Sequence, residues 1–285
     1  MAAVLQCRAP ASRRAERVTR PCASPKLLCT RVHVARSSAA CGRLVVHAGG
    51  WGAPVTWHEA RVAATTGAAE GLLSIQLDVG TTVANGFVRA GQYLQVRAEE
   101  TSKPAFIAVA SAVGSQNGLE LLVKASPTTE ALCALGVGAL LQVSDVQGKG
   151  FVLPPNYATQ GDVWLFGTGS GLSPLASLLD TPAALGGLAG LRGVRLVYGA
   201  RTPAHVPFAE RLRGWQAAGV EVTFIYSKDG KYVQDALAQM LSDGTGKRVD
   251  TSTTAVLVGQ KPMTEAVIAQ LTAHGVPRER IVMNF

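Results

Sequence analysis

Gly167-Thr168-Gly169-Ser170-Gly171-Leu172-Ser173-Pro174 is the most informative stretch of this 285-residue sequence. It follows a short apolar segment, residues 163–166, and precedes a segment with the apolar spacing of a helix. A glycine-rich turn between a strand and a helix lets the backbone approach a phosphate, and the helix N-terminus offers N–H groups and partial positive charge. Pro174 suits the first helical turn, where its missing N–H costs nothing. The stretch predicts a pyrophosphate-binding loop.

Two better-known phosphate motifs do not match this loop. A Walker A loop needs Gly-Lys-Ser/Thr after four intervening residues, and the usual dinucleotide fingerprint needs a small residue where Pro174 stands. A flexible Gly/Ser loop is the alternative interpretation. The position between a strand and a helix favours the binding loop.

The rest of the C-terminal half alternates between strands and helices. The expected strands are residues 163–166, 194–198, 220–226, 255–258 and 281–283. Four helices are expected between these strands. The first begins at Ser173-Pro174, and the second has Phe208, Leu212 and Trp215 on one face and ends at Gly219. The third is marked by the apolar residues Val233, Leu237 and Leu241, and the fourth by Met263, Val267, Ile268 and Leu271 before Gly275. Strands that alternate with helices predict a doubly wound parallel sheet of five strands.

The preceding part of the chain reads as an all-β domain. Its expected strands are residues 56–65, 72–79, 92–98, 105–110, 119–125 and 140–146, separated by glycine- and proline-containing turns. A short helix is expected over residues 129–135, with Thr128 or Thr129 as N-cap. The pattern predicts an antiparallel barrel or sandwich, and we take the six-stranded β-barrel as the expected fold of residues 49–155, joined near residues 153–161 to an α/β domain at 156–285.

The first 48 residues carry the net charge of +8. Nine of the 27 Lys and Arg residues lie here, but only one of the 19 Asp and Glu residues does. The rest of the chain therefore has 18 basic and 18 acidic residues. An Arg-, Ala- and Ser-rich segment with little acid is typical of an organellar transit peptide. We predict a transit peptide over residues 1–48, cleaved near Gly49; a disordered basic tail with a binding role is the alternative. The neutral remainder argues against nucleic acid as a partner.

After residue 48, the cysteine and histidine residues are too few and too far apart in the sequence to form disulfide bonds or a metal site. Cys133 is the remaining cysteine, and His58, His205 and His274 are not at ligand spacing. We therefore expect no disulfide framework and no metal site. No apolar run approaches the roughly 18 residues of a membrane span, so we expect no transmembrane segment.

Several motifs together resemble those of one enzyme family. The Gly-Thr-Gly-x-Gly-x-x-Pro run of 167–174 resembles the NADP-binding loop of ferredoxin-NADP reductases and their flavoprotein relatives. Val258-Gly259-Gln260-Lys261-Pro262-Met263 is similar to their Cys-Gly-x-x-x-Met segment at the nicotinamide side. The domain order and the terminal aromatic residue also match. The resemblance covers nearly all of residues 56–285 and is strongest to the plant and algal FAD/NAD(P)-binding oxidoreductases of the kiwi fruit protein-like group.

The resemblance implies two cofactors, FAD and NADP, and residues that bind them. On the NADP side these are Gly167, Thr168, Gly169, Ser170, Gly171, Pro174, Ser227, Lys228, Tyr232, Gly259, Gln260 and Met263, and on the flavin side Ala108, Ser111, Thr129 and Phe285. Thr129 has the alternative role of an ordinary N-cap, and Phe285 that of an anchor for the last strand. The resemblance assigns no catalytic acid–base residue and favours the chloroplast as destination, with the mitochondrion as alternative.

Residues 226–234 resemble the segment that grips the 2'-phosphate of NADP in the plant-type enzymes. Lys228 and Lys231 offer charge-assisted hydrogen bonds, and Tyr232 offers a face on which adenine can stack. We therefore expect a preference for NADPH over NADH. The alternative is that 227–231 is an ordinary solvated turn.

Three positions depart from the family pattern. Its flavin signature is Arg-x-Tyr-Ser/Thr-x-x-Ser, and here Ala105 stands at the Arg and Ile107 at the Tyr, while Ser111 is kept. Val258 stands where many relatives have Cys beside the nicotinamide, and Cys133 is expected to be a core residue of the short helix.

These observations lead to one principal hypothesis and two alternatives. The principal one is an NADPH-dependent flavoprotein oxidoreductase, in which hydride passes from NADPH to FAD N5 and electrons leave for a small electron-carrier protein or a small-molecule acceptor. The first alternative is a non-catalytic or regulatory nucleotide-binding module of the same fold with weakened or lost FAD binding. The second is a nicotinamide dehydrogenase without flavin.

Overall fold

The computed structural model describes residues 55–116, 118–155, 157, 161–181, 193–245 and 249–284. All described residues belong to one compact unit, Val45–Phe285. The predicted transit peptide with its cleavage point, and the predicted flavin contact of Phe285, lie outside the described residues. So does part of the predicted domain join.

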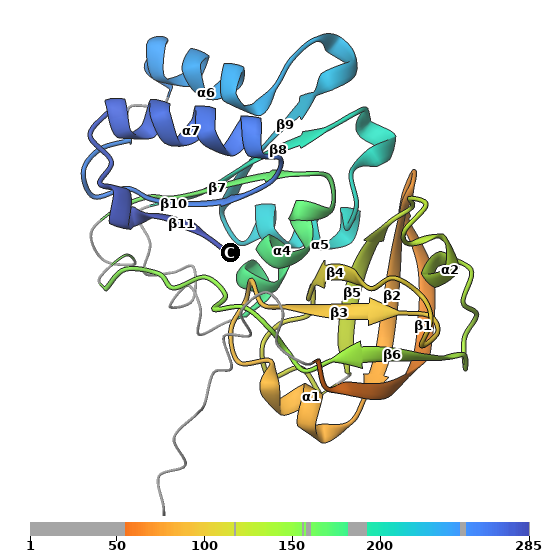
Figure 1. The fold of residues 1–285 in the computed structure, drawn as a ribbon. Helices are drawn as coiled ribbons and strands as arrows, with labels where there is room; N and C mark the ends of the chain where they lie inside the picture. Colours follow the sequence, from red (N-terminus) through yellow and green to blue (C-terminus); the bar gives the residue numbers. More distant parts are fainter. Residues whose placement is uncertain are drawn as a thin grey trace, which may run out of the picture. The chain divides into compact units, whose positions relative to one another are not determined.

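Six antiparallel strands form the first sheet (Figure 1). They are β1 (Trp57–Ala69), β2 (Leu72–Val79), β3 (Tyr93–Arg97), β4 (Ala105–Ala108), β5 (Leu119–Lys124) and β6 (Leu140–Ser144). Their order across the sheet is β4-β3-β6-β1-β2-β5. A bridge between Val109 and Leu121 joins the end of β4 to β5, so the sheet closes on itself. The predicted six-stranded antiparallel barrel is confirmed.

The barrel interior is filled by alternate residues of its strands, as strand geometry requires. In β3, Leu94 and Val96 are buried between half-buried neighbours. In β4, Ala105 and Ile107 belong to the barrel core. The helix α1 (Thr81–Gly86) was not predicted, because Val83 is its one buried residue and leaves no helical periodicity in the sequence.

Thr129 occupies the N-cap position of α2 (Glu130–Cys133) without capping it. Its hydroxyl donates to the Lys124 carbonyl oxygen at 2.6 Å and lies 2.9 Å from the Ser126 hydroxyl. The helix is also shorter than the predicted 129–135. Thr129 thus fastens the end of β5 to the start of α2, which corrects the N-cap interpretation.

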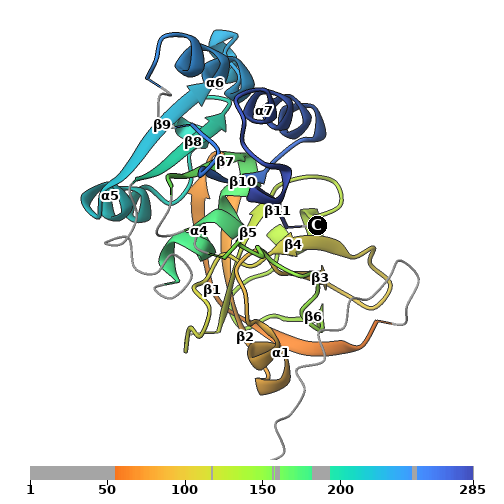
Figure 2. The same ribbon diagram turned by 90° about the vertical axis from the view of Figure 1, so that its left-hand side faces the viewer.

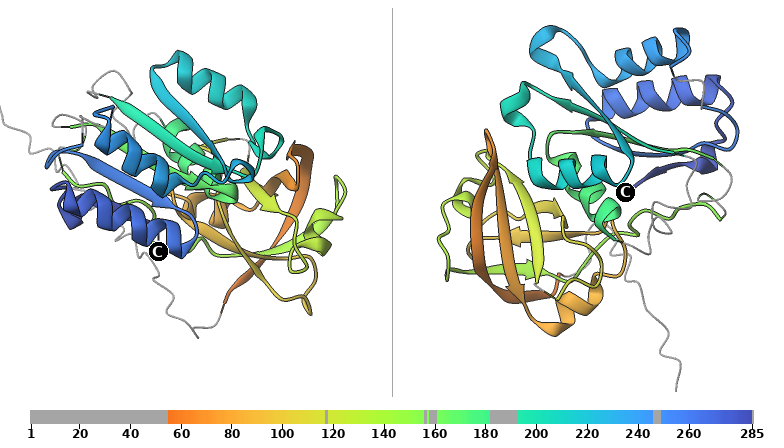
Figure 3. Two further views of the ribbon diagram at one scale, coloured as in Figure 1. Left: turned by 90° about the horizontal axis from the view of Figure 1, so that it is seen from above. Right: turned by 180° about the vertical axis from the view of Figure 1, so that it is seen from behind.

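Five parallel strands form the second sheet, in the order β11-β10-β7-β8-β9. They are β7 (Val163–Thr168), β8 (Val194–Ala200), β9 (Val220–Tyr226), β10 (Thr254–Val258) and β11 (Ile281–Met283). The helices are α4 (Leu172–Asp180), α5 (Ala209–Ala217), α6 (Val233–Ser242) and α7 (Lys261–Ala273), and short 3-10 turns are η1 (Gly169–Gly171), η3 (Pro203–His205), η4 (Ser227–Asp229) and η5 (Arg278–Arg280). Helices α6 and α7 lie on one face, and α4 and α5 on the other (Figures 1 and 3). The predicted doubly wound sheet is confirmed.

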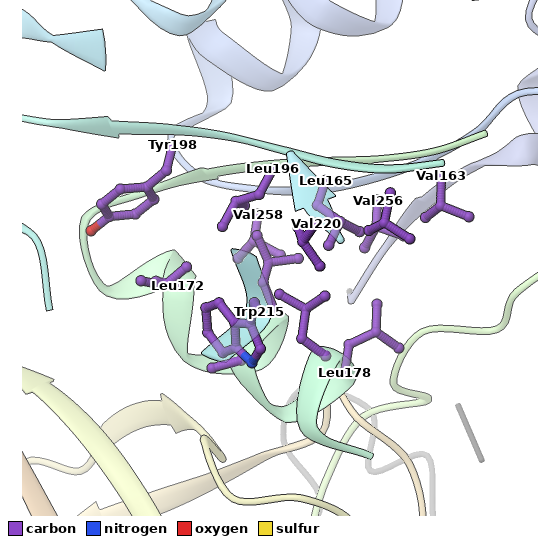
Figure 4. Packing of buried hydrophobic residues seen from close by; sticks show 14 of the residues in the cluster. Val163, Leu165, Leu172, Leu178, Leu196, Tyr198, Trp215, Val220, Val256 and Val258 are labelled. Carbon is purple, nitrogen blue, oxygen red and sulfur yellow. The ribbon is translucent and has the colours of Figure 1, made fainter. Parts of the chain in front are cut away.

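Both faces of this sheet are covered, which explains the unbroken apolar runs of its strands. Val163 and Leu165 of β7 pack with α4 and α5, whereas Trp164 and Phe166 pack with α6 and α7. Figure 4 shows the first cluster, in which Trp215 lies among the strand side chains.

Prediction and structure differ at the ends of elements. Gly167 and Thr168, predicted in the loop, complete β7. Phe208, predicted on the helical face, precedes α5 in a left-handed conformation with a φ of 61°. Gly219 and Gly275 follow their helices at φ of 96° and 87°, the left-handed conformation common after a helix C-terminus.

Helix α4 is bonded to the barrel near both of its ends, and Figure 2 shows it between β7 and the barrel strands. The Ser173 hydroxyl donates to the Ala108 carbonyl oxygen at 2.7 Å. At the other end, the Val113 N–H donates to the Thr181 hydroxyl at 2.9 Å. The helix that follows the glycine loop is therefore fixed to β4 and to the segment after it.

Arg211 of α5 forms a second junction with the barrel. Its guanidinium donates to Asp180 Oδ2 at 2.7 Å, to Glu120 Oε2 at 2.8 Å and to the Ala110 carbonyl oxygen at 2.6 Å. It also lies over the Phe208 ring, 4.4 Å from the centroid. A planar fork with several donors suits such a junction better than an ammonium group.

Candidate functional site

One large cavity, of about 1420 Å³, lies where the two sheets face each other. Residues at the carboxyl ends of β7, β8, β9 and β10, and Asn284 directly after β11, line it, and β3, β4 and β5 contribute residues from the barrel. In doubly wound folds ligands bind at the carboxyl ends of the strands, next to the point where strand order reverses. Here that point lies between β7 and β10, beside the glycine loop.

The glycine loop is held in shape by a buried tyrosine. The Tyr198 hydroxyl, in β8, donates to the Gly169 carbonyl oxygen at 2.8 Å, and Gly169 has a φ of 54°. Burial raises the pKa of Tyr198, so its hydroxyl stays protonated and able to donate even at a pH where an exposed tyrosine ionises. A Cβ at Gly171 would lie 2.6 Å from the Val258 carbonyl oxygen, so only glycine allows this close approach.

Most of the predicted loop residues line the cavity. These are Thr168, Gly169, Ser170, Gly171 and Pro174. Gly167 does not line it. Its role is packing, because a Cβ there would lie 2.8 Å from the Leu175 side chain.

A polar, cationic region forms at the ends of β8 and β9. The predicted residues Ser227 and Tyr232 line the cavity there, together with Lys231. Lys228 is not among the lining residues; its N–H donates to the Arg201 carbonyl oxygen at 3.1 Å. Arg201 itself lines the cavity and was missed. Its position directly after a parallel strand was the available signal, because such positions face the ligand crevice.

On the barrel side of the cavity, the aromatic residue of β4 is not at the position where the family signature has its Tyr. All four residues of β4 line the cavity: Phe106 is exposed there, whereas Ala105 and Ile107 are buried and also belong to the barrel core. Phe106 is 57% exposed, and its ring lies 5.9 Å from that of Tyr93 at an angle of 53°. An aromatic wall is therefore present, but one residue away from the position expected to carry it.

The polar part of the barrel wall lies after β5. Lys124, Ser126 and Thr129 line the cavity. Ser111, predicted as a flavin contact, does not; its hydroxyl accepts a hydrogen bond from the Glu120 N–H at 2.9 Å. This hydrogen bond joins the segment after β4 to β5.

The segment after β10 lies in the cavity as expected. Gly259, Gln260 and Met263 line it, and so does Val258. Cys133 does not, and its side chain packs against the barrel core. Burial raises the pKa of the Cys133 thiol, and its hydrogen bond with Thr129 lowers it in part.

Sequence reasoning missed a contact at the edge of the cavity. His205 lines it, with Nδ1 at 2.8 Å from the Thr202 hydroxyl and 3.6 Å from Glu70 Oε2. The Glu70 N–H also donates to the Ala204 carbonyl oxygen at 2.8 Å. The turn between β1 and β2 is thus bonded to η3.

Comparison with curated proteins decides the family. No family model matches the chain. The chain is 33% identical over 242 residues to fruit protein pKIWI502 of Actinidia deliciosa, a match that covers 76% of this chain and 73% of that protein. The chain belongs to the family of this kiwi fruit protein. It is also 31% identical over 138 residues to a probable dihydroorotate dehydrogenase B (NAD(+)), electron transfer subunit, of Methanothermobacter thermautotrophicus, covering 48% of this chain and 46% of that one.

Solved structures show that this pKIWI502-family chain has the ferredoxin reductase fold. Ferredoxin-NADP+ reductase from Plasmodium falciparum matches with a TM-score of 0.65 at 14% identity, over 80% of this chain and 95% of that one. The Amycolatopsis cytochrome P450 reductase GcoB matches with a TM-score of 0.67 at 20% identity, over 81% and 70%. Within the described residues, no helix has the length and apolar character needed to cross a bilayer.

Proposed function

We propose that this protein is an NADPH-dependent flavoprotein oxidoreductase that passes electrons to a small electron-carrier protein or a small-molecule acceptor. One observation carries the proposal: the cavity is lined on one side by residues at the carboxyl ends of β7, β8, β9 and β10 and directly after β11, and on the other by an exposed aromatic side chain of the barrel. FAD, when bound, supplies a ring that accepts hydride from NADPH and releases electrons to the acceptor.

The α/β side of the cavity fits a phosphorylated dinucleotide. The backbone at Gly169 and Gly171 is open to a pyrophosphate, and η1 leads into α4 at that point. Arg201 and Lys231 place two cations beside Ser227 and Tyr232, a set suited to a 2'-phosphate and its adenine. This arrangement supports a preference for NADPH.

The barrel side fits a flavin despite its departures from the family signature. Phe106 and Tyr93 offer aromatic faces for the ring, in place of the missing Tyr. Lys124 is a cation within the cavity, in place of the missing Arg, and Ser126 lies beside it. In this assignment Ala105 and Ile107 weaken FAD binding less than their positions in the sequence suggest, because Lys124 and the two aromatic rings supply the charge and the ring face that these residues lack.

The visible spectrum of purified protein beginning at Gly49 tests the proposal. We expect flavin absorbance bands that bleach on anaerobic addition of NADPH, and much less readily with NADH. A colourless protein that binds NADP+ but cannot be reconstituted with FAD would support the nucleotide-binding module instead. Nucleotide reduction of an acceptor without any flavin would support the plain dehydrogenase.

We further propose that residues 1–48 direct the protein to the chloroplast. The proposal rests on the Arg-rich, acid-poor composition of this segment and on the family resemblance. N-terminal sequencing of the protein from isolated plastids is expected to begin within a few residues of Gly49. Recovery of intact Met1, or recovery from mitochondria alone, would contradict it.

A further inference from the structure

Asn284 has a buried side-chain oxygen that no described residue satisfies. The residue follows β11 directly, is 6% exposed, and its Oδ1 has no hydrogen-bond partner among the described residues. Leaving a buried acceptor unpaired is unfavourable, so such an atom calls for a partner. The other buried polar atoms in this situation belong to Thr65, Trp164, Ser177 and Gln270. Of these residues, Asn284 alone lines the cavity, so it is the one that borders the space a ligand would fill.

The sheet places Asn284 at a defined position along the cavity. Leu257 of β10 pairs with Met283 of β11, so the next residues, Val258 and Asn284, lie side by side. The cationic region at Arg201 and Ser227 lies at the ends of β8 and β9, on the other side of the central strand β7. Asn284 is thus on the opposite side of the glycine loop from the proposed 2'-phosphate site.

A dinucleotide bound across this edge has its nicotinamide on the side of β10 and β11. If its 2'-phosphate lies at the ends of β8 and β9 and its pyrophosphate at the β7 loop, its remaining half extends toward Val258 and Asn284. Val258 is apolar and cannot bond the carboxamide of that ring. Asn284 can, because its Oδ1 accepts and a carboxamide NH2 donates.

The barrel also comes close to Asn284. The Asn284 carbonyl oxygen lies 3.8 Å from the position of a Cβ at Gly148, and the Tyr93 ring lies 2.8 Å from that position. Asn284 therefore stands between β10 and the aromatic barrel wall, where the nicotinamide and flavin rings must meet.

We propose that Asn284 binds and orients the nicotinamide carboxamide, with Oδ1 accepting a hydrogen bond from the carboxamide NH2. The inference rests on the proposed function. It assigns recognition of the nicotinamide ring to the residue after β11, beside Val258. No bond is made or broken; the contact fixes the rotation of the ring in its plane.

Calorimetric titration of Asn284→Leu tests the proposal with three ligands: NADP+, its nicotinic acid analogue, and 2',5'-ADP, which lacks the ring. We expect the affinity for NADP+ to fall by about three- to tenfold, the usual range for one hydrogen bond. The affinity for 2',5'-ADP is expected to stay unchanged, which also shows that the variant is folded. Wild type is expected to prefer NADP+ to the nicotinic acid analogue, whose carboxylate repels Oδ1, and the variant to lose that preference.

Gln270→Leu is the matched control, because Gln270 also has an unpaired buried amide oxygen but does not line the cavity. It is expected to leave the ratio of NADP+ to 2',5'-ADP affinity unchanged. The inference is overturned if Asn284→Leu changes both affinities equally or neither, or if it releases FAD, measured as flavin absorbance per protein. Wild type that binds neither nucleotide overturns the proposed function, and the inference with it.

Discussion

Tyr198 is a buried residue that helps to fix the shape of the glycine loop. Its hydroxyl fixes the Gly169 carbonyl, and its ring packs in the core between the sheet and α4. We expect Tyr198→Phe to lower the free energy of unfolding by about 0.5–1.5 kcal/mol and to weaken NADP+ binding several-fold, because the loop loses its anchor. Tyr157→Phe is the control, because Tyr157 packs against the same core cluster but does not line the cavity. Equal effects of the two variants on NADP+ binding would contradict this role.

The same residue predicts a pH dependence of stability. Burial raises the pKa of Tyr198 in the folded state, so the folded protein keeps a proton that the unfolded chain releases above about pH 10. The stability that wild type has over Tyr198→Phe is therefore complete below about pH 10 and declines as the pH rises further. Urea unfolding of both proteins between pH 8 and 11 measures it. A difference that grows with pH would have the wrong sign.

At the scale of residues, the sequence predicted which residues line the cavity where backbone geometry determines their position. It did not predict them where the direction of the side chain determines which residues face the cavity. The glycine loop was placed at the cavity because a glycine turn between a parallel strand and a helix must lie at the carboxyl edge of the sheet. Phe106 was missed because a one-residue shift in register moves every side chain of a strand to the opposite face. Asn284 was missed because it becomes notable only when its lack of a partner is known.

At the scale of elements, Arg211 is the side chain that most directly joins α5 to the barrel. It is 21% exposed and bonds Asp180 and Glu120 at once. We expect Arg211→Met to lower the free energy of unfolding by roughly 2–3 kcal/mol, because two half-buried carboxylates lose their cation. Arg211→Lys keeps the positive charge but loses the planar fork of donors, so we expect its free energy of unfolding to lie between those of wild type and Arg211→Met.

Arg213→Met is the control for Arg211. It lies in the same helix, but its ion pair with Glu210 is largely exposed, with side chains 63% and 87% accessible. Exposed pairs of this kind contribute about 0–1 kcal/mol. Guanidinium unfolding of the three variants compares them, and a loss at Arg213 as large as that at Arg211 would show that the junction contributes nothing special.

Helices and strands could be predicted from the sequence where their buried residues recur at a regular spacing. Strands β2, β9 and β11 match the expected ranges because turn residues bound them closely. Helix α1 and the short 3-10 turns were not predicted, because a few residues with one buried side chain leave no period in the sequence.

At the scale of the whole molecule, the fold class followed from the order of patterns along the chain. A run of short strands before a strand–helix alternation allows few architectures other than a barrel followed by a doubly wound sheet. The contacts between the two, at Ser173, Thr181 and Arg211, leave no signal in a single sequence, because residues far apart in the chain make them.

The two hydrogen bonds that fasten α4 to the barrel have a thermodynamic consequence. The Ser173 bond ends on Ala108, which shares β4 with Phe106, so the nucleotide loop and the aromatic wall belong to one connected element. Ligands that each favour the same arrangement of such an element bind cooperatively, and by linkage each raises the affinity of the other by an equal factor. We expect saturating NADP+ to tighten FAD binding, by about fivefold or more if the coupling is typical.

Thr181→Val removes the far bond without touching the cavity, and we expect it to reduce this cooperativity while leaving each ligand's separate affinity nearly unchanged. Thr264→Val, which removes a hydroxyl bonded within α7, is expected to preserve it. Titration of FAD with and without NADP+ decides between the two outcomes. If the coupling holds, the protein retains its flavin most firmly when the nucleotide is plentiful, and the concentrations of nucleotide and free flavin in its compartment together set the fraction of molecules that hold both ligands.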